Sequence, residues 1–264
     1  MNSGTLLLHI TLYGAIWMTL LWIWQVIRRD ATIVDVGWSV GMVGAAVYLG
    51  IHGPGDPVRR LVFALLAAVW AARLGGYLFF TRVYRHGQED GRYQRMRAAM
   101  GSRAHLGFFA FFHAQTLFIT LFSVPLLGPA ANPRTFPSPW DLIGILVWIG
   151  AMAGEWTADR QLHRFITNPA NKGKTCRIGL WNRSRHPNYF FEWLHWFAYI
   201  FLAMGSPLIW ASLAGPVIMF LFLFFITGIP HTEKQALSHR ADYAEYMKEV
   251  PMFFPRLFTG RSSS

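Results

Sequence analysis

Five ionisable side chains occur inside or at the edge of strongly apolar stretches, where a charge is costly unless it serves binding or catalysis. A carboxylate at such depth can act as an acid or hold a cofactor's polar groups, and an arginine can bind an anion. Three also have structural interpretations: Asp35 as an interfacial helix cap, Arg73 as the partner of a carboxylate, and Asp159 as the end of a span. The five are Asp35, Arg73, Glu155, Asp159 and Glu192.

The densest polar segment, residues 179–196, contains a cationic pair in front of a helix start. Pro187 suits the first turn of a helix, where its missing N–H costs nothing. Arg185 and His186 would then lie just before a helix N-terminus, where free backbone N–H groups and the helix dipole favour an anion. We interpret this pair as the mouth of a site for a phosphate-bearing ligand.

Behind this mouth the same segment carries a polar stripe. Asn188, Glu192 and His195 are spaced so that they share one face of a helix, which suits hydrogen bonding to a ligand deeper in a cavity. The alternative interpretation is a basic juxtamembrane loop that binds lipid head groups. That alternative accounts for the arginines but not for the polar stripe.

The composition is typical of a membrane protein. Hydrophobic residues make up 53% of the 264 residues and charged residues only 14%, whereas soluble domains carry about 25% charged residues. The apolar residues gather in stretches of the length that a helix needs to cross a bilayer, and the alternation typical of a membrane β-barrel is absent. We therefore predict an all-α, polytopic membrane protein with seven transmembrane helices at 4–27, 31–52, 58–82, 105–129, 138–158, 188–204 and 207–229.

The basic residues predict the orientation of these spans. With the connection after the first span placed inside, the inside segments hold 20 Lys and Arg, and the outside segments hold three, Arg59, Arg60 and Arg134. Positive residues favour the cytoplasmic side, so we expect the N-terminus outside and the C-terminus inside. The net charge of +11 then reflects topology and anionic partners, and nucleic-acid binding is not expected.

Several other kinds of site are not indicated. The single cysteine, Cys176, excludes an intrachain disulfide and a cysteine-rich metal site. The histidines lack metal-binding spacing, so no metal is expected. No Walker loop and no GxGxxG after a strand is present, and neither a cleavable signal peptide nor the internal repeat of many secondary transporters is evident. We expect a single membrane-embedded domain over residues 1–264.

The segment Thr175–Trp196, with the string RHPNY at 185–189 followed by Glu192, resembles the steroid 5-alpha-reductase superfamily. It looks closest to a bacterial branch catalogued only as a domain of unknown function. Weaker matches extend the resemblance over most of the chain; they are VDVGW at 34–38, WAARL at 70–74, DGRY at 90–93, YAEY at 243–246 and FP at 254–255.

The resemblance implies a seven-helix membrane oxidoreductase that uses NADPH in lipid metabolism. Hydride would pass from the nicotinamide to the β-carbon of a conjugated enone, such as a 3-oxo-Δ4-steroid, so that a CH–CH bond is formed. It further implies helices one to three (1–104) on the substrate side and the remainder (105–264) on the cofactor side. We expect a hydrophobic substrate to enter from the bilayer, and the protein to be a monomer among membrane lipids.

The resemblance also assigns residues position by position. An acid near the carbonyl oxygen stabilises the enolate, and Asp35 stands where the family has this acid as Glu. The family's tyrosine partner falls on Trp70 here, so Tyr77 is the substitute donor. Glu155 stands where the family has Asn. The cofactor-binding positions that the resemblance implies are Arg73, Arg82, Asp159, Arg164, Arg177, Arg185, His186, Asn188, Tyr189, Glu192, Trp196, His231, Arg240 and Tyr243.

Two other functions remain open from the sequence. Isoprenylcysteine carboxyl methyltransferases share an Arg-His-Pro-x-Tyr segment and bind S-adenosylmethionine, although Glu192, Asp35 and two further spans favour the reductase. The non-enzymatic alternative is a transporter or lipid-binding protein, which predicts no stoichiometric NADPH.

Overall fold

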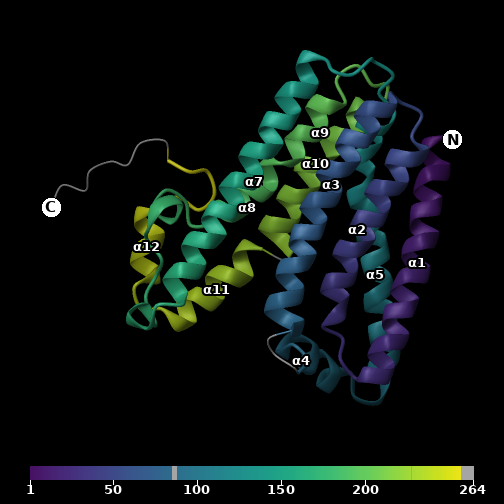
Figure 1. Ribbon diagram of the computed structural model, residues 1–264. Coiled ribbons are helices and arrows are strands. Elements are labelled where there is room, and N and C mark those ends of the chain that lie inside the picture. The colour runs from purple at the N-terminus through teal and green to yellow at the C-terminus, as the bar shows by residue number, and fades with distance from the viewer. Residues whose placement is uncertain (85–87, 227, 257–264) are drawn as a thin grey trace. The chain divides into compact units, whose positions relative to one another are not determined.

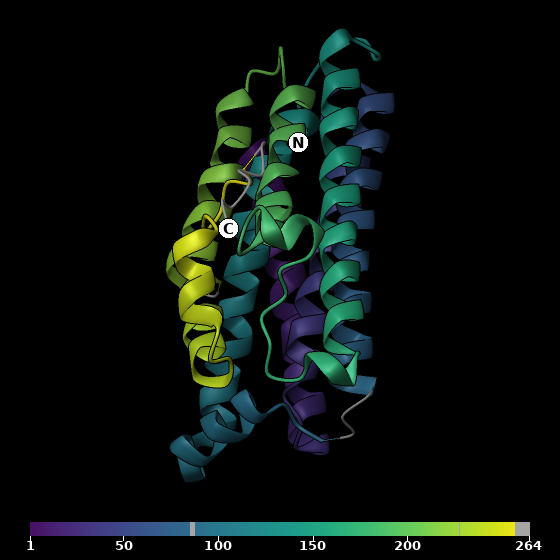
Figure 2. The ribbon, with the colours of Figure 1, turned by 90° about the vertical axis from the view of Figure 1, so that its left-hand side faces the viewer.

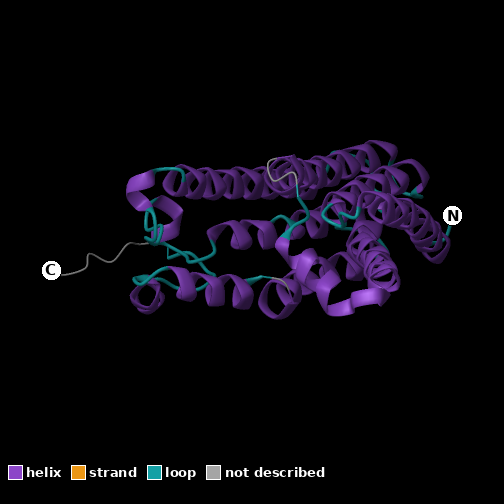
Figure 3. Cartoon of the chain, turned by 90° about the horizontal axis from the view of Figure 1, so that it is seen from below, coloured by secondary structure: helices purple, strands orange, loops and turns teal. Residues whose placement is uncertain are grey.

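The computed structural model describes residues 1–84, 88–226 and 228–256, and within these ranges it contains helices and loops but no strand (Figure 3). The chain forms two compact units. The first comprises Met1–Asp141 and Leu202–Ser212, and the second comprises Leu142–Phe201 and Leu213–Ser264. The sequence predicts one domain with its functional division at 104/105, whereas the compact units divide after Asp141.

The first unit is a bundle of long apolar helices in which α1, α2, α3 and α5 lie side by side (Figure 1). Asp56 begins α3 by accepting a hydrogen bond from the Arg59 backbone N–H, and Pro57 occupies the first turn. The helices are α1 (Ser3–Arg28), α2 (Ile33–His52), α3 (Pro57–Leu78), the π-helical η1 (Phe79–Tyr84), α4 (Gly91–Met100), the 3-10 turn η2 (Gly101–Arg103), α5 (Ala104–Ser123), the 3-10 turn η3 (Val124–Leu126) and α6 (Leu127–Ala130).

A buried ion pair fixes the start of α3. Arg59 Nε and Nη2 donate to the two carboxylate oxygens of Asp141, each at 2.7 Å, and neither side chain is more than 1% exposed. Arg59 Nη1 also donates to the backbone carbonyl of Arg134, and the N–H and hydroxyl of Ser138 donate to Asp141. Arg59, one of the three basic residues that the sequence predicts outside, is therefore a buried structural residue.

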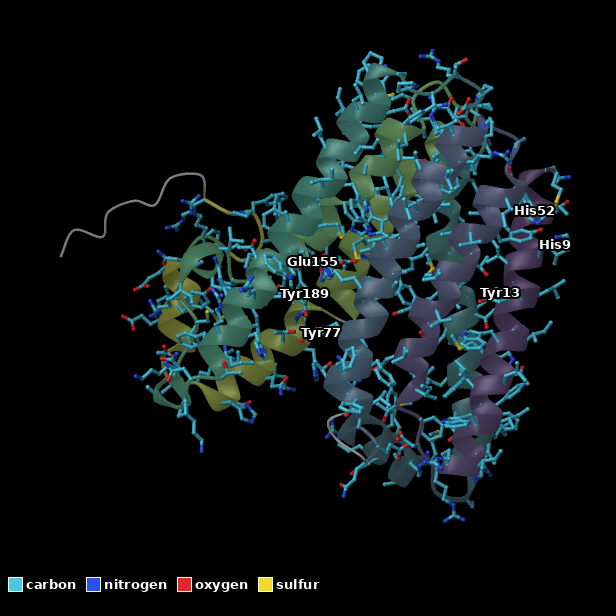
Figure 4. The ribbon with its side chains drawn as sticks, viewed as in Figure 1. His9, Tyr13, His52, Tyr77, Glu155 and Tyr189 are labelled. Atoms are coloured by element: carbon cyan, nitrogen blue, oxygen red, sulfur yellow. The ribbon has the colours of Figure 1, made fainter. Side chains whose placement is uncertain are left out.

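A histidine–tyrosine cluster joins α1 to α2. His9 Nδ1 lies 2.6 Å from the Tyr48 hydroxyl, and the Tyr48 and His52 rings have centroids 4.5 Å apart. Figure 4 shows His9 and His52 near the same end of these helices, with Tyr13 farther along α1. The cluster is exposed at both histidines, so it contributes to helix pairing rather than to a buried site.

The second unit is built on one long helix, α7 (Pro139–Ile166), whose first three residues belong to the first unit. Figure 2 shows α7 as a continuous teal helix and the C-terminal helices in yellow. The remaining elements are the 3-10 turns η4 (Pro169–Asn171) and η5 (Gly179–Asn182), α8 (Pro187–Leu194), α9 (Trp196–Leu202), α10 (Ile209–Leu221), the π-helical η6 (Phe222–Ile226), α11 (Ile229–His239) and α12 (Tyr243–Glu249).

Six helical segments are long and apolar enough to cross a membrane, and the protein is a helical integral membrane protein. The predicted span 188–204 is not among the six, because the structure divides it into α8 and α9 at His195. The six segments, among the described residues, are Ser3–Arg28, Ile33–His52, Pro57–Tyr84, Gly91–Ala130, Pro139–Ile166 and Ile209–His239.

Candidate functional site

A cavity of about 310 Å³ lies within the second unit, between the end of α7, the loop before α8, α8 itself, α11 and α12. Its wall combines aromatic rings with hydroxyl, amide, imidazole and guanidinium groups, which is the mixture of apolar surface and convergent polar groups typical of ligand sites. The lining residues are Leu162, Thr175, Cys176, Trp181, Arg185, His186, Asn188, Tyr189, Thr232, Gln235, Ala236, His239, Arg240, Tyr243 and Tyr246.

The loop before α8 is held in place by local geometry. Gly179 has a left-handed backbone (φ +56°), and a Cβ there would lie 2.3 Å from Gln161 Nε2. Gln161 instead accepts a hydrogen bond from the Leu180 N–H at 2.9 Å, so the loop closes onto α7. As the sequence predicts, Pro187 then occupies the first turn of α8.

The predicted cationic pair carries its own counter-ion. Arg185 Nε donates to Glu233 Oε1 at 2.7 Å, and His186 Nε2 lies 3.2 Å from the same oxygen. Arg185 Nη1 also donates to the carbonyls of Met247 and Val250. Arg185 is only 9% exposed and His186 only 2%, so this pair holds the cavity wall together instead of presenting free charge to an anion.

Arg240 is the other arginine of the lining. Among the described residues its guanidinium has no carboxylate partner. Its charge lies near Cys176 and Tyr243. Burial raises the pKa of the Tyr243 phenol to about 12, so Tyr243 remains a hydrogen-bond donor at neutral pH. Burial also raises the pKa of the Cys176 thiol, which Arg240 partly offsets.

Two predicted residues of α7 and α8 meet beside the cavity. Asn188 Nδ2 donates to Asp159 Oδ1 at 3.3 Å. Asp159 does not end the helix, because α7 continues to Ile166. The next residue, Tyr189, stacks on His186 with ring centroids 5.4 Å apart and an interplanar angle of 7°. The amide, the phenol and the imidazole therefore form one continuous face of the cavity.

Two hydrogen bonds connect the start of α12 to the loop before α8. Thr175 Oγ1 donates to Asp242 Oδ1 at 2.6 Å and its N–H donates to Oδ2 at 3.1 Å. Burial acts to raise the pKa of the Asp242 carboxyl, but these hydrogen bonds and the Arg177 charge outweigh it, so that pKa lies below its usual range. Arg177 pairs with Glu249 and lies over the ring of Tyr246.

Not every predicted cofactor residue lines the cavity. Arg164 and His231 are exposed, Glu192 is half-buried on α8, and Trp196 is 1% exposed at the start of α9. Arg177 is not part of the lining and pairs with Glu249 on α12. The structure thus brings Arg185, His186, Asn188, Tyr189, Arg240 and Tyr243 together around the cavity, with Asp159 hydrogen-bonded to one of them.

The predicted acid, Asp35, belongs to a separate polar centre in the first unit. It lies in the first turn of α2, where Thr32 occupies the cap position, so Asp35 is not the helix cap. Its Oδ2 accepts from Arg82 at 2.5 Å and from Arg92 at 2.8 Å. Its Oδ1 accepts from the hydroxyl of Tyr93 at 2.7 Å. The carboxylate therefore accepts three hydrogen bonds, two of them from cations.

Tyr93 on α4 donates a hydrogen bond to Asp35. Tyr93 is only 3% exposed, whereas Tyr77 on α3 is 56% exposed. Arg73 lies half-buried on α3, and Arg82 reaches Asp35 from the π-helical turn η1. Figure 4 shows the Tyr77 side chain on α3.

Sequence reasoning missed several residues of both centres. The DGRY motif at 90–93 supplies Arg92 and Tyr93, and that motif was the available signal. Asp90 begins α4 and accepts from Arg92; these bonds outweigh burial and hold the pKa of its carboxyl below the usual range. Thr232, Glu233 and Gln235 all lie on α11. Amphipathic helices commonly carry such polar residues, so no pattern in the sequence indicated that these three belong to the site.

A model of the family described as a protein of unknown function, DUF1295, matches residues 21–250. The chain belongs to this family. An uncharacterized protein of Schizosaccharomyces pombe is 27% identical over 285 residues, which cover 96% of this chain and 79% of the relative. No solved structure matches the chain. The matched region contains the whole cavity lining and the Asp35 centre, but the family description names no activity.

Proposed function

We propose that the protein is an integral membrane, NADPH-dependent reductase of the C=C bond of a conjugated enone lipid, of the steroid 5-alpha-reductase type. A 3-oxo-Δ4-steroid is the model substrate. NADPH supplies the hydride, and the second unit holds its adenosine 2′-phosphate end in the cavity. The observation that carries the proposal is Arg240, a cation in the lining with no carboxylate partner among the described residues, beside hydrogen-bonding and aromatic groups.

The cavity suits one nucleotide of the cofactor. Its volume of about 310 Å³ lies at the lower end of the roughly 300–1,000 Å³ of ligand sites, so the nicotinamide half would extend beyond it. The rings of Trp181, Tyr189 and Tyr243 offer surfaces for an adenine. Gln235 lines the same cavity with an amide suited to ribose hydroxyls, and Arg240 supplies the charge for a phosphate.

The second polar centre supports the chemistry of the substrate's carbonyl. Reduction at the β-carbon places negative charge on the enone oxygen, which a positioned cation can stabilise. Arg82 and Arg92 are such cations, and Asp35 Oδ2 accepts a hydrogen bond from each, at 2.5 and 2.8 Å. In this proposal Asp35 acts through these two arginines, because its carboxylate is the acceptor in all three of its described hydrogen bonds, the third being donated by the Tyr93 hydroxyl.

The first test identifies the ligand. Purified protein should release NADPH or NADP⁺ on denaturation, detected by mass spectrometry, and should consume NADPH absorbance when an enone steroid is added. Cys176 provides a readout that does not depend on turnover, since this thiol lines the cavity. NADPH should slow its alkylation by N-ethylmaleimide. Because burial raises the pKa of the thiol and the thiolate is the reactive form, alkylation of the free protein should accelerate with rising pH.

The competing functions give different results. A methyltransferase would protect Cys176 with S-adenosylmethionine and transfer a labelled methyl group, and the modest cavity volume favours this as the second candidate. A transporter or lipid-binding protein would show no protection by either nucleotide. Absence of protection by NADPH, together with no NADPH consumption, would refute the reductase.

The topology proposal follows the charge distribution. We propose seven spans, with α8 and α9 together forming the short sixth, the N-terminus outside and the C-terminus inside, in a bacterial inner membrane. Placing the C-terminus inside puts α11 and α12 on the cytoplasmic side, where NADPH is available. Accessibility of single cysteines introduced at positions 2 and 248 to a membrane-impermeant reagent would check this orientation.

A further inference from the structure

The exposed face of α7 carries a tryptophan and two arginines at successive turns. Trp156 is 55% exposed, and the Arg160 guanidinium lies 4.8 Å from the centre of its ring. Arg164 follows one further turn on and is also exposed. With four-residue spacing the three side chains form one ridge on the helix surface. We call Trp156, Arg160 and Arg164 the α7 ridge.

The length of α7 places this ridge at a membrane boundary. The helix has 28 residues, which at 1.5 Å per residue is about 42 Å, against a hydrocarbon core of about 30 Å. If Trp140 marks one boundary, the other falls after about 20 residues, near Asp159. Trp156 then lies in the boundary layer that tryptophan favours. Arg160 and Arg164 lie among the lipid head groups.

The ridge has an excess of positive charge. Neither arginine has a carboxylate partner among the described residues, and Arg164 does not line the cavity. Asn171 Nδ2 donates to the Phe165 carbonyl at 3.0 Å, which folds the loop after α7 back against the end of the helix. This loop carries the exposed Lys172 and Lys174.

A similar pair at the end of α1 provides a comparison. Trp24 is 52% exposed, and the Arg28 guanidinium lies 5.7 Å from its ring. This pair has Arg29 and the carboxylate of Asp30 beside it, whereas Arg160 and Arg164, with the single carboxylate of Asp159 before them, are followed by two lysines. The geometry is that of a general interfacial anchor, and the additional charge distinguishes the α7 ridge.

We propose that the α7 ridge, with Lys172 and Lys174, binds the head group of an anionic phospholipid. The phosphate would lie between Arg160 and Arg164, and Trp156 would pack on the glycerol and upper acyl region. Charge complementarity identifies the occupant, since four cations meet a phosphodiester at the depth where the lipid phosphates lie. The inference is independent of the reductase proposal, because the ridge is formed outside the cavity.

The test measures lipid retention on the full chain. Native mass spectrometry of the protein titrated with phosphatidylglycerol or phosphatidylcholine should show preferential retention of phosphatidylglycerol. The double variant R160Q/R164Q should bind it more weakly by about fivefold for each arginine removed, hence by about 25-fold. The matched variant R28Q/R29Q removes the same charge from α1 and should retain most of the affinity.

A second pair of substitutions guards against misfolding. K172Q/K174Q changes only the exposed loop and should lower the phosphatidylglycerol affinity in the same direction, with thermal unfolding in phosphatidylcholine unchanged. Equal losses in R160Q/R164Q and R28Q/R29Q would overturn the proposal, because they would mean a general effect of charge. Displacement of phosphatidylglycerol by added NADPH would overturn it too, by assigning the ridge to the dinucleotide.

Discussion

Arg185 and Arg240 line the same cavity but have different electrostatic roles. Arg185 pairs with Glu233 and donates to two backbone carbonyls, so its charge is neutralised within the cavity wall. Arg240 has no such carboxylate among the described residues. A phosphate dianion gains most from a cation that is not already neutralised, which makes Arg240 the residue that should separate NADPH from NADH.

Substituting Arg240 tests this role directly. R240Q should weaken NADPH binding by about 10- to 100-fold, the equivalent of losing a charged hydrogen bond of about 1.5–3 kcal/mol, and should leave NADH binding nearly unchanged. Equilibrium titration of both nucleotides gives the comparison. K248Q, an exposed cation on α12, is the control. Equal losses for NADPH and NADH would show that Arg240 does not contact the 2′-phosphate.

At the scale of helices, apolar length predicted most elements but not the division of one predicted span into two helices. The predicted spans 4–27 and 31–52 correspond closely to α1 and α2. The predicted span 188–204 is divided because α8 ends at Leu194, and the ring of His195 turns back to the Glu192 carbonyl at 2.5 Å. Hydropathy records how apolar a segment is, but not where a side chain competes for a backbone carbonyl.

The Arg59–Asp141 ion pair joins the first turn of α3 to the first turn of α7 within the first unit. Removing one partner would leave an uncompensated buried charge, which costs about 3–5 kcal/mol. We therefore expect R59M and D141L each to lower thermal stability markedly, as measured by a dye-based unfolding assay in detergent. The double variant should be less destabilised than the sum of the two. Additive losses would mean that the two side chains act independently.

Across the whole molecule, the proposed chemistry is divided between the two compact units. The first unit holds the Asp35 centre, and the second holds the cavity. D35N should lower enone turnover at least tenfold, since a misaligned catalytic hydrogen bond typically costs that much or more, while NADPH still protects Cys176. N188A should instead lower NADPH affinity, because Asn188 lines the cavity.

Y93F separates the two oxygens of the Asp35 carboxylate. If Asp35 acts by holding Arg82 and Arg92, Y93F should reduce turnover much less than D35N, because the bonds from the two arginines to Asp35 Oδ2 remain. Equal losses in Y93F and D35N would show that the hydrogen bond from Tyr93 is needed as much as the arginines. Circular dichroism of each variant controls for folding.

The candidate site was predictable to the extent that it lies within one stretch of sequence. Arg185, His186, Asn188 and Tyr189 are near neighbours along the chain, and the structure places all four in the lining of one cavity. Glu233 lies 48 residues from Arg185, and Tyr93 lies 58 residues from Asp35. Pairings over such separations depend on how helices pack, which no local pattern of residue types records.

The length of α7 has a kinetic consequence. Because α7 is about 12 Å longer than the hydrocarbon core is thick, we propose that its last turns, which reach the cavity at Leu162, lie in the head-group layer at the edge of the aqueous phase. A water-soluble ligand can therefore leave and return without entering lipid, while an oil-soluble molecule stays in the bilayer. The rate of a reaction between two such compounds would then depend on two quantities that the cell adjusts independently. One is the ratio of oxidised to reduced nucleotide in the cytoplasm, and the other is the surface density of the lipid.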